Sequence, residues 1–263
     1  MKRLEKYVIV AKEDEYSLSL KQKLQIVLDM NGFNEDEDHP QLLITIGGDG
    51  TFLHAIHRYL SLDQDLMIVG IHTGTLGFFT SYKDTELDLF IEDLLNLHYD
   101  VHHLPILGVN LNQNHQNYHF EAINEIRIEN VVRTQSIEVK INNNEFETFR
   151  GTGLCISTQA GSTAYNRSLS GAILQDGLNL LQLTEITGIH HRAYRSLGSP
   201  LILKEDTVIE LFSENFDEAI LCYDHLSIPI NNACSLKIAY TQKNIQVWMR
   251  KNNNYLERLQ SLF

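Results

Sequence analysis

The sequence predicts two domains, an α/β domain built on a parallel sheet and a β-rich domain that resembles a β-sandwich. In residues 1–100, short apolar runs alternate with segments of helical periodicity, as in a parallel sheet whose strands are joined by helices. In residues 101–244, apolar residues recur with a period of two, as in half-buried strands. The tail, about 245–263, combines a strand-like run with an amphipathic end, and one option is that it returns to the first domain.

The elements of the first domain follow from its apolar pattern. Strands are expected in three aliphatic and β-branched runs, Lys6–Ala11, Gln41–Ile46 and Leu66–Ile71. Helices are expected where apolar residues recur three and four positions apart, in Tyr16–Met30, Phe52–Leu60 and Glu86–Leu97. Gly32 is placed to end the first of these helices.

The second domain shows strand-like alternation from Ile106 to Ser157. Within this stretch, the run Ile137–Ile141 leads into Asn142-Asn143-Asn144, a hairpin turn with asparagines where a positive φ is needed. Leu178–Leu183 is expected to form a short helix or turn. Further strands are expected at Leu201–Leu203, Thr207–Phe212, Ala219–Cys222 and Ser235–Tyr240.

Composition excludes several classes of protein. The chain has 263 residues and a formal net charge of −13, so binding to nucleic acid through bulk charge is not expected. No apolar run approaches the roughly 20 residues of a membrane helix, and membrane association is not expected either. The N-terminus reads as a first strand and not as a signal peptide, and the three cysteines form no CxxC pair, which together favour a cytoplasmic location. The histidines lack metal-ligand spacing, so no metal site made by the protein is expected.

The stretch GGDGT at 47–51 is the most informative motif. It lies between an expected strand and an expected helix, where parallel sheets place ligand-binding loops. Its glycines allow a tight turn and leave N–H groups for phosphate oxygens at a helix N-terminus. The alternative is a simple glycine turn in which Asp49 caps the helix. The stretch matches neither a Walker loop nor a complete dinucleotide fingerprint.

Two polar clusters follow in the second half of the chain. Gly161–Ser168 (GSTAYNRS) places small hydrogen-bonding side chains beside one aromatic ring, which suits a pocket for a base, although a polar turn is the alternative. Asn124-Glu125 interrupts an apolar alternation and is by itself compatible with a solvated strand face.

The order of these clusters along the chain resembles that of the NAD kinase family. GGDG alone also occurs in diacylglycerol, sphingoid-base and phosphofructo-kinases, but GSTAYN with the downstream GSPL and DH is far more specific. The matching segments span nearly the whole chain: IGGDGTFLHA (46–55), GIHTGTLGF (70–78), Asn124-Glu125, FRGTGLCIST with GSTAYNRSL (149–169), GSPLIL (198–203) and YDHLSI (223–228). The resemblance implies transfer of phosphate from ATP to the 2′-hydroxyl of the adenosine ribose of NAD. It also implies a divalent cation, Mg²⁺, held mainly by the phosphates of ATP.

The resemblance implies roles for single residues. Asp49 matches the acid that accepts the proton of the ribose hydroxyl, and it also contacts NAD. Phosphate contacts are implied for Gly47, Gly48, Gly50 and Thr51, and Gly50 also lies against the dinucleotide. NAD contacts are implied for Asn124 and Glu125 at the adenine and ribose, and for Asp224 and His225 near the nicotinamide ribose. The segment around the adenine comprises Thr163, Ala164, Tyr165, Asn166, Arg167 and Ser168, with Tyr165 stacking on the base.

Four further positions complete the implied NAD site: His54, Arg150, Thr152 and Thr187. His54 either reaches the ligand or lies on the helix surface. Thr152 stands where many relatives carry an aspartate that contacts NAD, often from a neighbouring subunit. Thr187 stands where relatives often place alanine. The resemblance accordingly implies a homo-oligomer, commonly a tetramer.

Two other functions fit part of this pattern. A lipid kinase would share only the GGDG loop. A non-catalytic NAD(P) sensor, suggested by Thr152, would bind the dinucleotide without turnover and would be unaffected by Asp49→Asn. The sequence leaves open whether ATP or polyphosphate is the donor, whether NADH is accepted, and whether NADP inhibits.

Overall fold

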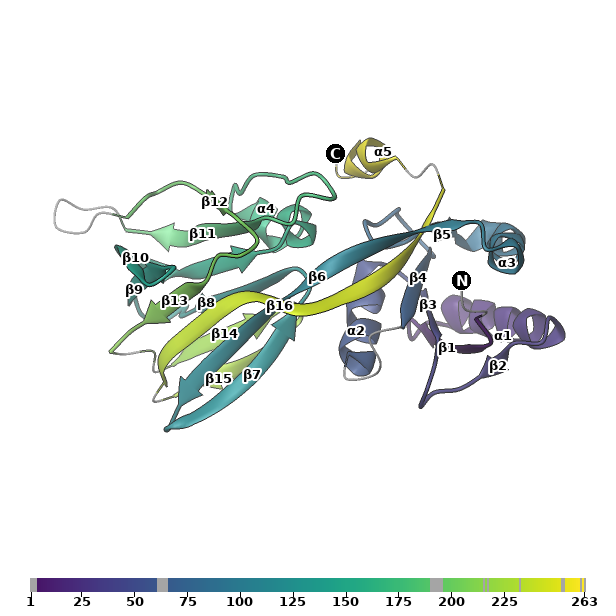
Figure 1. The fold of residues 1–263 in the computed structure, drawn as a ribbon, viewed down its shortest axis with the longest axis horizontal. Coiled ribbons are helices and arrows are strands. Elements are labelled where there is room, and N and C mark those ends of the chain that lie inside the picture. The colour runs from purple at the N-terminus through teal and green to yellow at the C-terminus, as the bar shows by residue number, and fades with distance from the viewer. Residues whose placement is uncertain are drawn as a thin grey trace. The chain divides into compact units, whose positions relative to one another are not determined.

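The chain folds into two compact units (Figure 1). One unit comprises Met1–Leu104 together with Asn244–Phe263, and the other comprises Pro105–Lys243. The computed structural model describes residues 4–60, 66–189, 196–214, 216, 218–231, 233–251, 254–260 and 262. Within these ranges, no helix combines the length and the apolarity that a membrane span requires.

The first unit is an α/β domain around a parallel sheet, as expected. Its strands are β1 (Lys6–Ala11), β2 (Asn34–Glu35), β3 (Leu42–Ile46), β4 (Met67–His72) and β5 (Tyr82–Lys83). β1 lies between β2 and β3, and β4 follows β3, with all of these pairs parallel. β5 and the last part of β16 (Ala233–Arg250) pair in parallel with β4. The helical segments are α1 (Glu15–Met30), α2 (Asp49–Tyr59), η1 (Asp84–Glu86), α3 (Leu87–Asn96) and α5 (Tyr255–Gln260).

Local capping explains where the first two helices start and end. The carboxylate of Asp14 accepts the backbone N–H of Ser17 at 2.8 Å and caps α1, and Gly32 follows its end with a φ of 83°. α2 begins at Asp49, three residues before the apolar stripe that predicts it, because the N–H of Phe52 already donates to the carbonyl of Gly48 at 3.1 Å. The second half of the GGDGT loop is therefore the first turn of a helix.

The C-terminal end of β16 belongs to the first unit, a placement that its periodicity alone does not decide. Trp248 is fully buried in the core of this unit and stacks on Tyr99, with ring centroids 4.0 Å apart. Its indole N–H donates to the hydroxyl of Tyr82 at 3.1 Å. One aromatic side chain thus secures the returning strand in a core otherwise made by residues 1–104.

The second unit is rich in antiparallel strands. They are the last part of β6 (Tyr99–Gln113), β7 (Gln116–Ala122), β8 (Glu125–Glu129), β9 (Gln135–Ile141), β10 (Asn144–Ser157), β11 (Leu181–Gly188), β12 (Leu201–Leu203), β13 (Ile209–Phe212), β14 (Ala219–Tyr223), β15 (Leu226–Ile230) and the first part of β16. The strands run in the order β15-β14-β8-β10-β9-β13-β16, β6 pairs with β16 and β7, and β11 joins β10 to β12. Their inward faces bury one apolar core, to which Leu107, Ile126, Val139, Ile156 and Leu211 contribute.

Two sequence expectations are decided in this unit. The hairpin is confirmed, since Asn142 and Asn143 have φ values of 50° and 63° between β9 and β10. The short helix or turn expected at Leu178–Leu183 is wrong from Leu181 onward, where β11 begins. The side chain of Gln182 exchanges hydrogen bonds with the backbone of Ala172 at 2.7 and 3.0 Å, so this polar residue is satisfied inside a buried strand.

Candidate functional site

In the first unit, the Asp49 carboxylate is fixed by a neighbouring loop. It accepts the backbone N–H of Phe78 at 2.9 Å and that of Phe79 at 3.1 Å, one on each oxygen. Both donors lie in the loop after β4, next to the loop that carries Asp49 after β3. Each carboxylate oxygen keeps a second lone pair, which a ligand hydroxyl can use.

Two glycines allow this arrangement. A Cβ at Gly77 would lie 2.1 Å from Oδ1 of Asp49, so only glycine lets the second loop approach the carboxylate. A Cβ at Gly47 would lie 2.3 Å from Oγ1 of Thr51, and Gly47 has a φ of 155°. By contrast, a Cβ at Gly48 or Gly50 would meet no described atom within 4 Å. These two exposed glycines leave open space at the N-terminus of α2, as close approach of a ligand requires.

The loop after β4 is held in turn by the C-terminal helix. The guanidinium of Arg258, which is buried, donates to the carbonyls of Phe78 and Thr80, the latter at 2.9 Å. Arg258 therefore supports the backbone segment whose N–H groups hold Asp49. Neither this arginine nor the two phenylalanine N–H groups is predicted by the sequence, because backbone contacts between loops leave no residue pattern.

In the second unit, the Asp224 carboxylate caps a bend in the chain. It accepts the backbone N–H groups of Ile123, Asn124 and Glu125 at 2.8, 2.7 and 3.3 Å. Asp224 has a φ of 52° in the turn between β14 and β15. Its carboxylate thus positions the Asn124-Glu125 backbone, a role that the sequence does not reveal.

The segment that starts at Thr158 packs on the same bend. The Thr158 hydroxyl donates to the carbonyl of Ile123 at 2.6 Å, and a Cβ at Gly161 would lie 2.0 Å from the carbonyl oxygen of Asn124. The elements η2 (Ala160–Thr163) and α4 (Tyr165–Ser168) follow directly. The structure therefore brings Thr163, Ala164, Tyr165, Asn166, Arg167 and Ser168 into the neighbourhood of Asn124, Glu125 and Asp224.

Several polar atoms in this cluster are buried without a hydrogen-bond partner among the described residues. They are Oδ1 of Asn124, Oε2 of Glu125, Nε of Arg127 and Nδ2 of Asn166. Asn166 is otherwise anchored by the Thr184 hydroxyl, which donates to its Oδ1 at 2.7 Å. Buried polar groups are normally satisfied, so a group of orphans in one place is the mark of a binding site for a polar ligand.

Electrostatics set Glu125 apart. The pKa of its carboxyl is raised to about 7, mainly by burial and by the nearby charges of Asp224 and Glu129, while the charge of Arg127 opposes the shift. The Arg127 guanidinium bonds to the Glu129 carboxylate and lies 3.7 Å from Oε1 of Glu125. Strongly shifted carboxyls concentrate at functional sites. The alternation Glu125, Arg127, Glu129 is the one sequence feature that could have pointed to this arginine.

Three of the expected site residues lie elsewhere. In register, Ser157 of β10 faces Glu125, whereas Arg150 and Thr152 lie toward the other end of the strand, beside Thr187 of β11. Five residues of strand separate Ser157 from Thr152, or about 16 Å at 3.3 Å per residue. Arg150 lines a hollow of about 790 Å³ with polar neighbours such as Ser136 and Thr148. One copy of the chain therefore does not bring this group to the Asn124-Glu125 cluster.

The two histidines of the expected site are exposed. His54 lies on the surface of α2, and His225 lies in the turn after Asp224. Among the described residues, no group of three or more His, Cys, Asp and Glu side chains is arranged to hold a metal ion.

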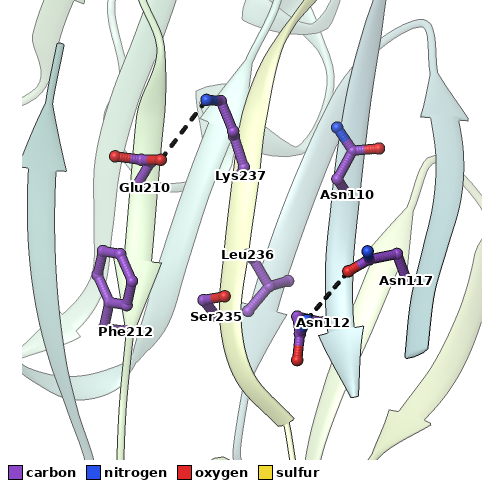
Figure 2. A pocket seen from close by; sticks show the side chains of 8 residues that line it. All are labelled: Asn110, Asn112, Asn117, Glu210, Phe212, Ser235, Leu236 and Lys237. Atoms are coloured by element: carbon purple, nitrogen blue, oxygen red, sulfur yellow. Dashed lines mark hydrogen bonds and ion pairs between the residues drawn. The ribbon is translucent and has the colours of Figure 1, made fainter. Parts of the chain in front are cut away.

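A second hollow, of about 390 Å³, lies on the outer face of the second unit and contains none of the expected site residues (Figure 2). Its walls come from β6, β7, β13 and β16. Figure 2 shows that its charged side chains, Glu210 and Lys237, face each other, with 3.6 Å between Oε1 and Nζ. Its other lining residues are three asparagines, a serine, a phenylalanine and a leucine, which form no set of groups suited to catalysis.

Comparison with known proteins covers both units. Residues 10–99 match the family model described as the ATP-NAD kinase N-terminal domain, and residues 123–250 match the ATP-NAD kinase C-terminal domain. The chain is 35% identical over 260 residues to an NAD kinase of Enterococcus faecalis, covering 98% of each chain. It is 33% identical over 263 residues to an NAD kinase of Staphylococcus aureus strain JH9, covering 95% of this chain and 97% of that one.

Two solved structures share the fold. A yeast NADH kinase complexed with NADH superimposes with a TM-score of 0.87 at 19% identity, over 99% of this chain and 88% of that one. An Archaeoglobus fulgidus NAD kinase in complex with ATP superimposes with a TM-score of 0.77 at 17% identity, over 98% of both chains.

Proposed function

The chain belongs to the NAD kinase family, and from that premise we propose that it transfers the γ-phosphoryl group of ATP to the 2′-hydroxyl of the adenosine ribose of NAD. Its family membership makes it an enzyme that phosphorylates NAD with ATP. A lipid kinase or a silent sensor is not favoured, because the named NAD kinases match 95% or more of the chain and not the GGDG loop alone.

The observation that supports the proposed chemistry is the fixed Asp49 carboxylate. Its two backbone hydrogen bonds orient both oxygens, and the open space at Gly48 and Gly50 admits a ligand beside them. Asp49 accepts the proton of the attacking ribose hydroxyl, which is general-base help of about 10²–10⁴-fold. Phosphoryl transfer otherwise requires alignment of the two oxygens and neutralisation of charge.

The phosphates of ATP fit the N-terminus of α2. Gly48, Gly50 and Thr51 provide backbone N–H groups there, and helix N-termini attract anions. Gly47, whose own N–H donates to the carbonyl of Ile71 at 2.9 Å, lies against the phosphates through the tight turn that it allows. A divalent cation, Mg²⁺, neutralises the triphosphate when bound. Since the described residues offer no cluster of metal ligands, the phosphates supply most of its coordination.

The adenosine half of NAD occupies the cluster in the second unit. The orphaned atoms of Asn124, Glu125 and Asn166 offer both donors and acceptors, and Tyr165 offers a ring for stacking. Thr163, Ala164, Arg167 and Ser168 complete the wall around the base. Asp224 and His225 approach the dinucleotide from the turn after β14.

The position of Arg150, Thr152 and Thr187 supports a homo-oligomer. Because Arg150 and Thr152 lie far along β10 from Glu125, with Thr187 beside them on β11, we assign all three to the pocket of a neighbouring copy. A tetramer, the assembly that the family resemblance implies, is the proposed form. The enzyme works where ATP and NAD are pooled, in the cytoplasm.

A coupled assay tests the proposed reaction. Purified protein is incubated with Mg²⁺, ATP and NAD, and NADP is measured with an NADP-specific dehydrogenase. Asp49→Asn is expected to lower kcat by about 10²–10⁴-fold while the Kd of NAD changes by less than about threefold, because the carboxylate accepts the proton in the transition state and contributes little to binding of the substrate. Absence of NADP with wild-type protein, or full activity of Asp49→Asn, would refute the proposal.

A further inference from the structure

The polar face of β8 carries Arg127, which has no role in the proposed phosphoryl transfer. Glu125, Arg127 and Glu129 alternate along the strand and therefore share one face. The Arg127 side chain is only 15% exposed, and it bonds to Glu129 on one side while its Nε lies 3.7 Å from the Glu125 carboxylate on the other. An arginine buried to this degree costs free energy unless its partners are well placed, so its retention inside the pocket points to a role there.

The same guanidinium lies over the ring of Tyr165. Its central carbon is 3.8 Å from the ring centroid, the distance of direct stacking. Tyr165 is the first residue of α4, a helix of only four residues. One face of the ring is thus covered by Arg127, and a planar ligand has only the opposite face available.

We propose that Arg127 is a positioning residue for the dinucleotide: its guanidinium backs the Tyr165 ring and orients the Glu125 carboxylate, so that adenosine meets both in a preset arrangement. This inference rests on the proposed function, because it takes the adenosine half of NAD as the ligand. Arg127 itself touches Tyr165 and the two carboxylates, and it acts through them. Preorganisation of this kind lowers the entropic cost of binding and therefore strengthens affinity.

The charges around Glu125 predict a second effect of Arg127. The Glu125 carboxyl faces Asp224 in the β14–β15 turn, Glu129 and Arg127 on its own strand, and the backbone of Tyr165 in α4. The Arg127 guanidinium is flanked by Cys155 of β10 and Cys222 of β14. Burial and the two acids raise the pKa of Glu125; Arg127, the cation of this group, opposes them, and the net pKa is about 7. Without the cation, Glu125 takes up its proton at a higher pH, and a protonated carboxyl accepts hydrogen bonds from NAD less well.

Calorimetric titration of NAD in the absence of ATP tests the proposal with Arg127→Met and Arg127→Lys. Arg127→Met removes both the charge and the planar stack, and it is expected to raise the Kd of NAD at pH 8 about tenfold or more, while the Kd of ATP stays within about twofold. The midpoint of the pH dependence of NAD binding moves upward in Arg127→Met and stays in place in Arg127→Lys, which keeps the charge. The matched control is Arg133→Met, an arginine whose side chain is 60% exposed and pairs with Glu218 at 3.0 Å; it should bind NAD as the wild type does.

The outcomes separate this inference from the proposed function. Wild-type NAD affinity and an unmoved pH midpoint in folded Arg127→Met would overturn the role of Arg127, as would equal losses of NAD and ATP affinity. If Arg127→Met does not fold, the proposal is tested with Arg127→Lys alone. An increase of several-fold in the Kd of NAD supports the positioning role of Arg127, and an unchanged Kd overturns it. Wild-type protein that binds NAD but forms no NADP refutes the kinase proposal and still allows Arg127 to be judged. Wild-type protein that binds no NAD refutes both.

Discussion

Single carboxylates in this chain are oriented by backbone N–H groups. Asp49 receives two such donors from the loop after β4, and Asp224 receives three from the Ile123–Glu125 bend. Hydrogen bonds to a carboxylate are roughly twice as strong as those between neutral groups, so both side chains are held tightly. Their tasks differ nevertheless, since Asp49 faces open space beside Gly48 and Gly50 whereas Asp224 is buried.

Asp224→Asn tests the capping role. An amide presents an NH₂ group to N–H donors, so at least one buried donor loses its partner at a cost of about 1–3 kcal/mol. We expect a lower Tm and weaker NAD binding, because the Asn124-Glu125 backbone is no longer fixed. Asp206→Asn, in an exposed loop between β12 and β13, is the matched control and should leave both unchanged. A variant with wild-type Tm and affinity would show that the cap is dispensable.

Glu125→Gln tests the shifted carboxyl through stability. The folded state raises the pKa of Glu125 from 4.5 to about 7, so it binds a proton that the unfolded chain has already released between these two values. The free energy of unfolding of the wild type therefore contains a term that falls as the pH rises from about 4.5 to 7. Glu125→Gln lacks this term, so its Tm should rise relative to that of the wild type between pH 5 and pH 8. The corresponding change in the difference in free energy of unfolding is no more than about 3 kcal/mol. A Tm difference that is independent of pH would contradict the shift.

At the scale of elements, the carboxylate of Asp49, to which we assign the role of base, depends on two loops and a helix distant in the sequence. The loop after β3 carries Asp49, the loop after β4 fixes it, and Arg258 of α5 holds the second loop by its carbonyls. Such support lets a side chain on a loop keep the definite geometry that a catalytic group needs.

Gly77→Ala tests this dependence. The added Cβ would lie 2.1 Å from Oδ1 of Asp49 and must push the carboxylate or the loop away. We expect kcat to fall at least tenfold with a smaller change in the KM of NAD, since misplacement of a reacting group by an ångström costs up to about 10² in rate. Gly74→Ala is the matched control in the same loop, because its Cβ meets no described atom within 4 Å. Equal activity of the two variants would argue against a role for the loop.

Most helices and strands could be predicted from the sequence, but the contacts between loops and between segments distant in the sequence could not. β1, β3 and β4 of the first unit and the Asn142–Asn143 hairpin follow from apolar periodicity and turn chemistry, both of which are local, whereas the two-residue strands β2 and β5 are too short to show a period. The helix or turn expected at Leu178–Leu183 is wrong from Leu181 onward, because Gln182 is satisfied by the backbone of Ala172, ten residues away, a contact that strand or helix periodicity does not reveal. The glycines identify the GGDGT loop in the sequence, but the N–H groups that hold Asp49 belong to the backbone and leave no side-chain pattern.

At the scale of the whole molecule, β10 divides the expected site residues into two groups. Glu125 pairs with Ser157 at one end of the strand, whereas Thr152 lies about 16 Å and Arg150 about 23 Å away toward the other end. If each group served the same copy of the chain, one bound dinucleotide would have to reach both ends of β10. A symmetric assembly removes this requirement, because a neighbouring copy can present its Arg150 group to the pocket.

Complementation between two inactive variants tests whether sites are shared. Asp49→Asn lacks the carboxylate that we propose as the base, and Arg150→Ala lacks the contribution that we assign to the neighbour. In a mixed pair, the Arg150→Ala copy keeps Asp49 and receives Arg150 from its partner, so one of the two sites is complete. Random mixing of refolded subunits should then restore up to about a quarter of wild-type kcat, since half of the pairs are mixed and half of their sites are intact. Sedimentation velocity of the same mixtures establishes that the copies associate. If mixing restores nothing while the oligomer forms, Arg150 serves its own copy and the shared-site proposal is wrong.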